Sequence, residues 1–354
     1  MATLVYEEIG DHEVRALLPE PPAGELRPRP RTARLDRFTP EGGGELETLE
    51  LRYETYGTLS PARDNAVVVF HALTGSAHAA GVYEAGVLAA LSPYERAFGA
   101  RGWWSEVVGP GRALDTGRYF VVSMNVPGSC YGSSGPHEDP GFPQLSLRDM
   151  VRAQARLLDH LGVPAARVVG GSMGGMLALE FALTFPERTQ ALAVFAAPAR
   201  QGAWARAWQH LQREAARRGD LALGRALSML SYRHPAGFEQ RWADEPVQAE
   251  RYLDHQGAKF TRRFSAASYA LLTRAMDAHD VGRGRGGLEA ALARLSAPAI
   301  FVGIDSDLLY PAAEVRRVAA AARSEYAEIA SAHGHDGFLI ESDQVSRILR
   351  AFGF

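Results

Sequence analysis

The sequence predicts an α/β protein in which a mostly parallel sheet is flanked by helices and carries a helical cap. Short runs that are apolar at every position recur along the chain and alternate with stretches of helical periodicity. Continuous apolar runs are typical of strands buried on both faces, and their alternation with helices is typical of parallel sheets. Residues 198–292 break this alternation, because helical sequence continues there without a buried strand.

Composition and charge exclude several classes of protein. The 354 residues are 46% hydrophobic and 22% charged, which is ordinary for a globular protein, and the net charge of -3 gives no general attraction to nucleic acid or membrane. Cys130 is the single cysteine, so no intrachain disulfide is expected. The N-terminus has no basic start followed by an apolar run, and no stretch reaches the roughly 18 apolar residues of a spanning helix. We therefore expect a cytoplasmic enzyme.

The first part of the core is expected over residues 1–197, and residues 1–32 are rich in proline and predict an extended arm. A glycine-rich turn at residues 41–45, followed by alternating residues 46–56, predicts a hairpin. Buried strands are predicted at residues 67–70, 119–124, 168–170, 191–195 and 299–304. Helices of the core are predicted at residues 147–161 and 173–185.

The cap is expected over residues 198–292, before the last part of the core at 293–354. Its helical stretches are residues 204–218, 221–230, 248–259 and 265–278. Such an insertion can shield an active site and shape an acceptor pocket, although a helical layer that only adds stability is the alternative. Gly282, Gly284 and Gly287 match a dinucleotide-binding pattern, but they follow helical sequence rather than a strand, so we expect a loop there.

The strongest functional signal is Gly170-Gly171-Ser172-Met173-Gly174, which lies between a predicted strand and a predicted helix. A sharp strand-to-helix turn brings backbone close to both sides of the serine, so the flanking residues must lack a Cβ. This nucleophile elbow is typical of the α/β-hydrolase fold. The motif therefore predicts Ser172 as a nucleophile.

A serine hydroxyl needs a base to take its proton and a third group to orient that base. In α/β hydrolases the acid follows a late strand, and the histidine lies near the C-terminus. Asp305 and Asp307 both follow the last predicted strand, and His333 and His335 both lie near the end of the chain. Spacing alone does not choose within either pair. A metal site at His333, His335 and Asp336 is not expected, because no further ligand cluster accompanies them.

An acyl-transfer reaction also needs donors for the oxyanion. The N–H of Met173, which follows the nucleophile, is one expected donor. The second is expected from residues 71–75, which follow the first buried strand. Leu73 is the first candidate and Thr74 the second.

Several further segments add specificity to this pattern. In the core they are residues 53–57, 71–75, 102–104, 109–111, Asn125 with 130–132, 170–175 and 334–339, and in the cap they are 252–257, 275–277 and 282–284. Together they resemble the homoserine O-acetyltransferase family of α/β hydrolases, over most of the chain from Leu51 to Leu339. The resemblance implies that Asp307 and His335 complete the triad.

The resemblance also implies how an amino-acid acceptor binds. Arg213 in the first cap helix, Tyr232 in the cap and Asp336 match the acceptor-binding residues of the family. An arginine suits a carboxylate and a carboxylate suits an ammonium group. Arg206 and Arg217 lie near Arg213 on the same predicted helix and are alternatives to it.

The function implied by the resemblance is transfer of acetyl from acetyl-CoA to L-homoserine through an acetyl-Ser172 intermediate, in methionine biosynthesis. Acetyl-CoA is then a co-substrate, no permanently bound cofactor is expected, and a homodimer is expected because dimers are common in the family. Pro127 and Ser129 stand where the family usually has Leu and Gly, which leaves succinyl-CoA as donor and serine as acceptor open. A cap-gated esterase is the alternative of another class. Cys130 is expected to be a buried packing thiol.

Overall fold

The computed structural model describes residues 24–354, so residues 1–23 of the predicted N-terminal arm lie outside the described part. The strands of the main sheet are β1 (Arg31–Phe38), β2 (Leu46–Tyr56), β3 (Ala66–Phe70), β6 (Phe120–Met124), β7 (Ala166–Gly171), β8 (Thr189–Phe195), β9 (Ala299–Ile304) and β10 (Glu325–Ile329). Two short strands, β4 (Val108–Gly109) and β5 (Leu114–Asp115), pair separately.

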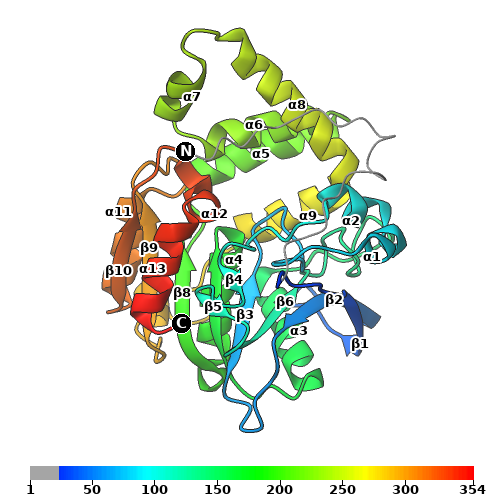
Figure 1. Cartoon of the computed structure of the whole chain (residues 1–354), viewed down its shortest axis with the longest axis vertical. Helices are drawn as coiled ribbons and strands as arrows, with labels where there is room; N and C mark the ends of the chain where they lie inside the picture. The colour runs from blue at the N-terminus through cyan, green and yellow to red at the C-terminus, as the bar shows by residue number, and fades with distance from the viewer. Residues whose placement is uncertain (1–23) are drawn as a thin grey trace.

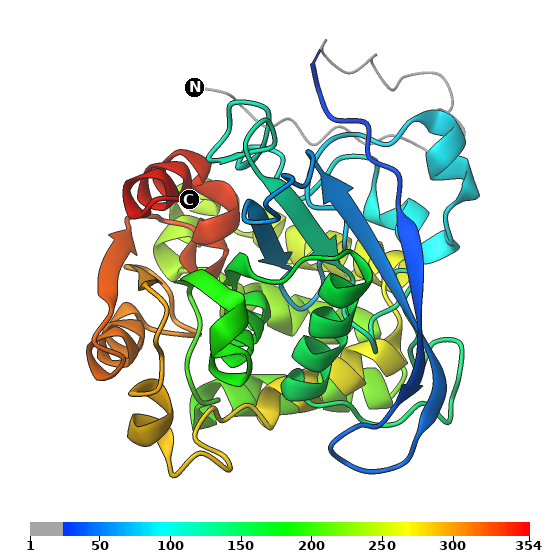
Figure 2. The same cartoon turned by 90° about the horizontal axis from the view of Figure 1, so that it is seen from below.

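The eight strands of the main sheet lie in the order β1-β2-β6-β3-β7-β8-β9-β10. The six neighbouring strands β6, β3, β7, β8, β9 and β10 are parallel to one another. Strands β1 and β2 form an antiparallel hairpin, and β2 pairs antiparallel with β6. Figure 2 shows β1 and β2 along one side of the molecule and β10 with its neighbouring helix on the opposite side. The predicted α/β fold class, the hairpin and the five buried strands are confirmed.

The helices of the core are α1 (Ala85–Ala90), α2 (Pro93–Phe98), α3 (Leu147–His160), α4 (Met173–Thr184), α10 (Leu288–Leu292), α11 (Ala312–Ala321), α12 (Gly337–Ile340) and α13 (Ser342–Phe352). Residues Met173 to Ala182 of α4 are all buried. A helix with apolar residues on all faces belongs in an interior, and α4, in which Glu180 is the one charged residue, packs against β3, β7 and β8. Among residues 24–354, no helix combines the length and hydropathy needed to cross a membrane.

The cap helices lie above the sheet in Figure 1. They are α5 (Ala203–Arg217), α6 (Leu221–Tyr232), α7 (Pro235–Trp242), α8 (Val247–Arg263) and α9 (Ala266–Asp277). The chain leaves the core and returns to it at one place, because the N–H of Gln201 donates to the carbonyl of His279 at 2.9 Å and the N–H of Val281 to that of Ala199 at 3.0 Å. These bonds form the neck of the cap. The cap therefore ends before residue 292, where the sequence placed its boundary, because α10 follows the neck and packs against α11 of the core.

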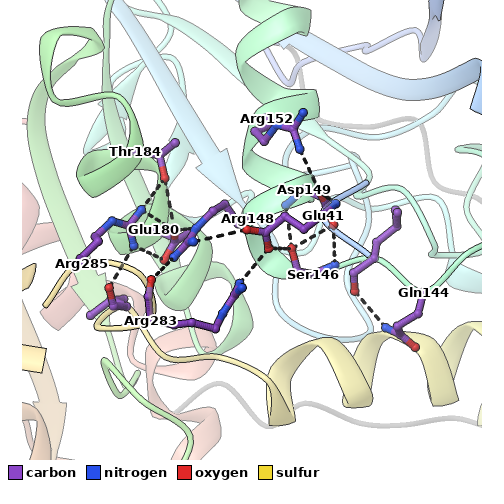
Figure 3. Close-up of polar contacts among 12 residues, drawn as sticks. Glu41, Gln144, Ser146, Arg148, Asp149, Arg152, Glu180, Thr184, Arg283 and Arg285 are labelled. Atoms are coloured by element: carbon purple, nitrogen blue, oxygen red, sulfur yellow. Dashed lines mark hydrogen bonds and ion pairs between the residues drawn. The ribbon is translucent and has the colours of Figure 1, made fainter. Parts of the chain in front are cut away.

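A polar network joins the return segment after the cap to the core (Figure 3). The buried carboxylate of Glu180 in α4 accepts hydrogen bonds from Arg148 and Arg285, each at 2.6 Å. Glu41, in the turn of the β1–β2 hairpin, lies 3.3 Å from Arg148 and 2.7 Å from Arg283. Burial alone would raise the pKa of Glu180, but its hydrogen bonds with the two arginines hold that pKa below its usual value.

Candidate active site

Ser172 occupies the tight turn between β7 and α4. Its backbone has φ 58° and ψ -127°, a left-handed conformation that costs a residue with a side chain about 1–3 kcal/mol. The Ser172 N–H donates to the carbonyl of Phe195 in β8 at 2.9 Å, which helps to hold the turn. The strained backbone is therefore supported by the neighbouring strand.

The glycines of the motif are required by close backbone. A Cβ at Gly170 would lie 2.3 Å from the carbonyl oxygen of Gly174. A Cβ at Gly174 would lie 2.2 Å from the carbonyl oxygen of Phe70 in β3. Both distances are far below van der Waals contact, which agrees with the reason given for the glycines from sequence.

The structure brings Ser172, His335 and Asp307 into one chain of contacts. The Nε2 of His335 lies 2.8 Å from the Ser172 Oγ, and its Nδ1 lies 2.7 Å from Oδ2 of Asp307. The Oδ1 of Asp307 accepts hydrogen bonds from the N–H groups of Leu309 and Tyr310. All three side chains are buried.

These contacts decide between the two candidate acids, Asp305 and Asp307, and between the two candidate bases, His333 and His335. Asp305 accepts a hydrogen bond from the N–H of Ser331 at 3.0 Å and does not contact an imidazole. His333 has an exposed side chain and bonds the Ser331 hydroxyl through its backbone N–H. Asp307 and His335 are the members of the pairs that reach Ser172.

Opposing effects act on the imidazole of His335. Burial lowers its pKa, whereas the charge and hydrogen bond of Asp307 raise it, and the net shift is upward. The carboxylate thus favours the imidazolium that forms when His335 takes a proton. The arrangement can therefore activate a serine hydroxyl by general-base catalysis.

Of the two expected oxyanion donors, Leu73 lines the same cavity as Ser172, and Met173 directly follows Ser172 in the chain. The N–H of Leu73 donates to no acceptor within the described residues. Met173 is the first residue of α4, where helix N–H groups lack an intrahelical partner. Both amides are thus available to an anion beside Ser172.

His71 supports the loop that carries Leu73. Burial lowers the pKa of His71 to about 4, so its imidazole is neutral near pH 7. The Nε2 of His71 accepts the N–H of Val126 at 3.0 Å, and its Nδ1 therefore donates to the carbonyl of Ala72 at 2.7 Å. The loop is fixed by a histidine that takes no part in the triad.

A cavity of about 200 Å³ opens beside Ser172, between the core and the cap. Tyr232 and Asp336, two of the three residues expected to bind an acceptor, line it. The ring of Tyr232 lies 5.7 Å from that of His335. One oxygen of Asp336 pairs with Arg233 at 3.2 Å.

Arg213, the third expected residue, does not line this cavity. Its guanidinium pairs with the carboxylate of Asp277 in α9. The two alternatives are also engaged elsewhere, since Arg206 bonds the carbonyl of Asp277 and Arg217 pairs with Glu214 on the exposed face of α5. The expectation of an acceptor arginine in α5 is therefore corrected: packing of α5 against α9 turns Arg213 toward Asp277.

The cavity instead receives Arg225 from α6 and Arg263 from α8, two residues that were not predicted from the sequence. Arg225 forms no hydrogen bond or ion pair within residues 24–354, and its Nε is buried without a partner. Its guanidinium lies over the ring of Phe260, 5.0 Å from the centroid. One signal was available: Arg225 lies seven residues before Tyr232, so the two share a helix face.

Cys130 is buried, as expected, and burial raises the pKa of its thiol to about 12. Its Sγ accepts a hydrogen bond from the N–H of Ser265 at the start of α9. A thiol with this pKa carries negligible thiolate near pH 7. Cys130 therefore packs the core against the cap and does not compete with Ser172.

Comparisons with known proteins agree with this geometry. Residues 65–342 match the family described as alpha/beta hydrolase fold. The chain is 57% identical over 380 aligned residues to the homoserine O-acetyltransferase of Thermus thermophilus, covering 99% of this chain and 100% of that protein. The crystal structure of a homoserine O-acetyltransferase from Staphylococcus aureus has a TM-score of 0.79 at 31% identity, covering 92% of this chain and 95% of that one. Esterase E22 has a TM-score of 0.81 at 22% identity, covering 92% and 99%, and so shares the fold.

Proposed function

Because the chain belongs to the homoserine O-acetyltransferase family of α/β hydrolases, we propose that it transfers an acetyl group from acetyl-CoA to the hydroxyl of L-homoserine. One observation carries the proposal: the cavity beside Ser172 also holds an unpaired cap arginine and a carboxylate, Arg225 and Asp336. Ester hydrolysis needs neither group, whereas an amino-acid acceptor needs both. The product, O-acetyl-L-homoserine, serves methionine biosynthesis.

In the first half of the reaction, His335 takes the proton of the Ser172 hydroxyl as its oxygen attacks the thioester carbonyl. The N–H groups of Leu73 and Met173 hold the oxyanion of the tetrahedral intermediate. The intermediate collapses, the bond from carbon to sulfur breaks, and His335 returns its proton to the departing CoA thiolate. An acetyl ester of Ser172 remains.

In the second half, homoserine enters the cavity that CoA has left. Its carboxylate binds Arg225, and its ammonium group binds the carboxylate of Asp336. His335 takes the proton of the homoserine hydroxyl, whose oxygen attacks the acetyl-serine. Collapse of the intermediate transfers the acetyl group and restores the Ser172 hydroxyl with the proton from His335.

Transfer succeeds only where water does not consume the acetyl-serine. The cap, which covers the triad and supplies Arg225 and Tyr232 to the cavity, is the proposed barrier to water. The enzyme is proposed to act in the cytoplasm without a bound cofactor. The exposed side chains of Leu211, Leu223 and Leu230 on α5 and α6 support a homodimer formed through the cap.

A cap-gated esterase is the second candidate, and the fold similarity to esterase E22 favours it. The two functions differ in how the thiol of CoA is released. Release from acetyl-CoA that depends on homoserine supports transfer, whereas equal release without an acceptor contradicts transfer and supports hydrolysis. Mass spectrometry of Ser172→Ala should find no acetylated protein. Assays with succinyl-CoA and with serine, run alongside, test the choice of donor and acceptor.

A further inference from the structure

Four cationic side chains gather where α6 and α8 border the active-site cavity: Arg225, Lys259, Arg262 and Arg263. None of them pairs with a carboxylate within residues 24–354. The other arginines around the site differ in this respect, since Arg213 and Arg233 each contact an aspartate. Unmatched positive charge next to a substrate cavity is a feature that binds anions.

Helix geometry places the members of this cationic cluster close together. Lys259 lies one turn before Arg263 on α8 and three residues before Arg262, so it neighbours both. Arg225 reaches the same turn from α6, with its guanidinium over the ring of Phe260. Burial lowers the pKa of Lys259, and the charges of the three arginines lower it further. The like charges therefore repel one another in the absence of an anion.

The cluster divides into an inner and an outer pair. Arg225 and Arg263 line the cavity, whereas Lys259 and Arg262 are exposed to solvent. Arg263 is engaged by the protein, because it donates to the carbonyl of Thr74 at 3.0 Å and to the hydroxyl of Tyr131 at 2.8 Å. The outer pair has no such partners within the described residues and takes no part in the reaction steps above.

The proposed donor has a matching distribution of charge. In an acyl-CoA the thioester lies at the end of a long uncharged pantetheine arm, and the diphosphate and 3′-phosphate lie at the other end. When the thioester carbonyl is at Ser172 inside the cavity, the phosphates must remain outside it. Lys259 and Arg262 are exposed cations directly beside the inner pair that lines the cavity.

We propose that Lys259 and Arg262 bind the phosphates of the acyl-CoA donor, with the pantetheine arm running past the inner pair into the cavity. The inference rests on the proposed function, since it concerns the donor of the same reaction. It adds a division of labour within the cap: the inner Arg225 serves the acceptor and the outer pair serves the donor.

The test compares two donors that share the thioester and the pantetheine arm. Acetyl-pantetheine lacks the 3′-phosphoadenosine diphosphate of acetyl-CoA, and therefore all of its phosphate groups. In the double variant Lys259→Gln/Arg262→Gln, kcat/KM for acetyl-CoA should fall by about tenfold to a hundredfold, the value of one or two charge-assisted contacts. The kcat/KM for acetyl-pantetheine should not change. Arg218→Gln/Arg251→Gln, which removes the same charge from exposed positions of the cap, is the matched control.

An equal loss with both donors, no loss with acetyl-CoA, or the same loss in the control variant would overturn the inference. Failure of the proposed function is a separate outcome, because it would appear in the unaltered protein as acceptor-independent release of thiol from acetyl-CoA. The two ideas therefore fail in different experiments.

A second measurement does not depend on turnover. Lys259 is the only lysine of the sequence, so an amine-reactive reagent reports on this position through a single tryptic peptide in mass spectrometry. Desulfo-CoA, which cannot react, should slow the labelling of Lys259 by about tenfold at a saturating concentration. Absence of protection, or equal protection by inorganic phosphate at the same concentration, would contradict a site for the CoA phosphates.

Discussion

The Nδ1 of His335 lies 2.7 Å from Oδ2 of Asp307, and this contact decides which tautomer of the imidazole faces Ser172. With its proton on Nδ1, His335 presents an unprotonated Nε2 to the serine hydroxyl. Two backbone N–H groups hold the other oxygen of Asp307, so the carboxylate cannot rotate away. The backbone thus orients Asp307, and Asp307 orients the imidazole of His335 toward Ser172.

Replacing Asp307 with asparagine tests this orientation. The amide of Asp307→Asn can donate to Nδ1, which favours the wrong tautomer and leaves the imidazolium without a counter-charge. We expect kcat to fall by roughly ten-thousandfold, measured as thiol release from acetyl-CoA with homoserine present. Asp305→Asn, a change two residues away, should keep most of the activity. Comparable losses in both variants would mean that loop integrity, and not the tautomer, is responsible.

The pH profile follows from the raised pKa of His335. Neutral imidazole is the active form, so kcat/KM rises with pH and its midpoint lies above the ordinary histidine value of 6.5. The charge of Asp336 contributes to the upward shift. Asp336→Asn should therefore move the midpoint to lower pH. Hydrolysis of p-nitrophenyl acetate without an acceptor measures this free from any effect on homoserine binding, and an unchanged or higher midpoint would contradict it.

Arg225 and Arg213 give opposite predictions. Arg225→Gln should raise KM for homoserine by about tenfold to a hundredfold, with a smaller effect on KM for acetyl-CoA, because a charge-assisted contact to the carboxylate is lost. Arg213→Gln should leave KM for homoserine unchanged and lower the thermal stability, since it leaves the carboxylate of Asp277 without its partner. If Arg213→Gln produced the homoserine effect instead, the placement of the acceptor would be wrong.

The nucleophile elbow has no room for a Cβ at Gly174. Gly174→Ala would place a methyl group against the carbonyl of Phe70, and relieving that overlap should cost about 1–3 kcal/mol or more of folding free energy. Gly86→Ala in α1 meets no atom within 4 Å and should be neutral or slightly stabilising. Urea denaturation of the two variants measures the difference, and equal midpoints would show that the elbow relaxes.

The network around Glu180 predicts a loss of stability without a loss of chemistry. Glu180→Gln leaves Arg148 and Arg285 without their buried counter-charge, which should cost about 2–4 kcal/mol of unfolding free energy at neutral pH. The rate per folded molecule should stay the same. Glu214→Gln, which removes an exposed ion pair of α5, is the control and should have no measurable effect.

The same network has a defined dependence on pH. The folded-state pKa of Glu180 is lowered, so its stabilisation is present above the ordinary value of 4.5 and is lost as the pH falls through the folded-state value. The gap in stability between the unaltered protein and Glu180→Gln should therefore narrow in acid. A gap that widened as the pH fell would contradict the ion-pair explanation.

The buried strands could be predicted from sequence because burial on both faces leaves continuous apolar runs, as in β3 and β9. Strand β10 gives no such run: it lies at the edge of the sheet, where only Ile329 is fully buried. Helix α7 was missed for a similar reason, because none of its residues is buried. Sequence patterns thus reveal an element in proportion to the apolar surface that it buries.

Some residues of the candidate site could be predicted from the sequence, and others could not. The order of Ser172, Asp307 and His335 along the chain is set by the strands that carry them, so it could be predicted. The arginine that enters the cavity was not predicted, because the cap helices carry several arginines and the packing of the cap decides which of them turns inward. The spacing of Arg225 from Tyr232 was the one sequence signal, but it does not show that packing leaves this arginine without an ion pair.

The neck of the cap has a consequence for how such enzymes diversify. Because the chain leaves and re-enters the core at Ala199 and Val281, which are hydrogen-bonded to each other, the intervening helices form a module with adjacent ends. Such a module can be exchanged between relatives or lengthened without altering the register of any strand. Acceptor choice can then evolve in the module, while the elbow, the acid and the base remain in an unaltered scaffold.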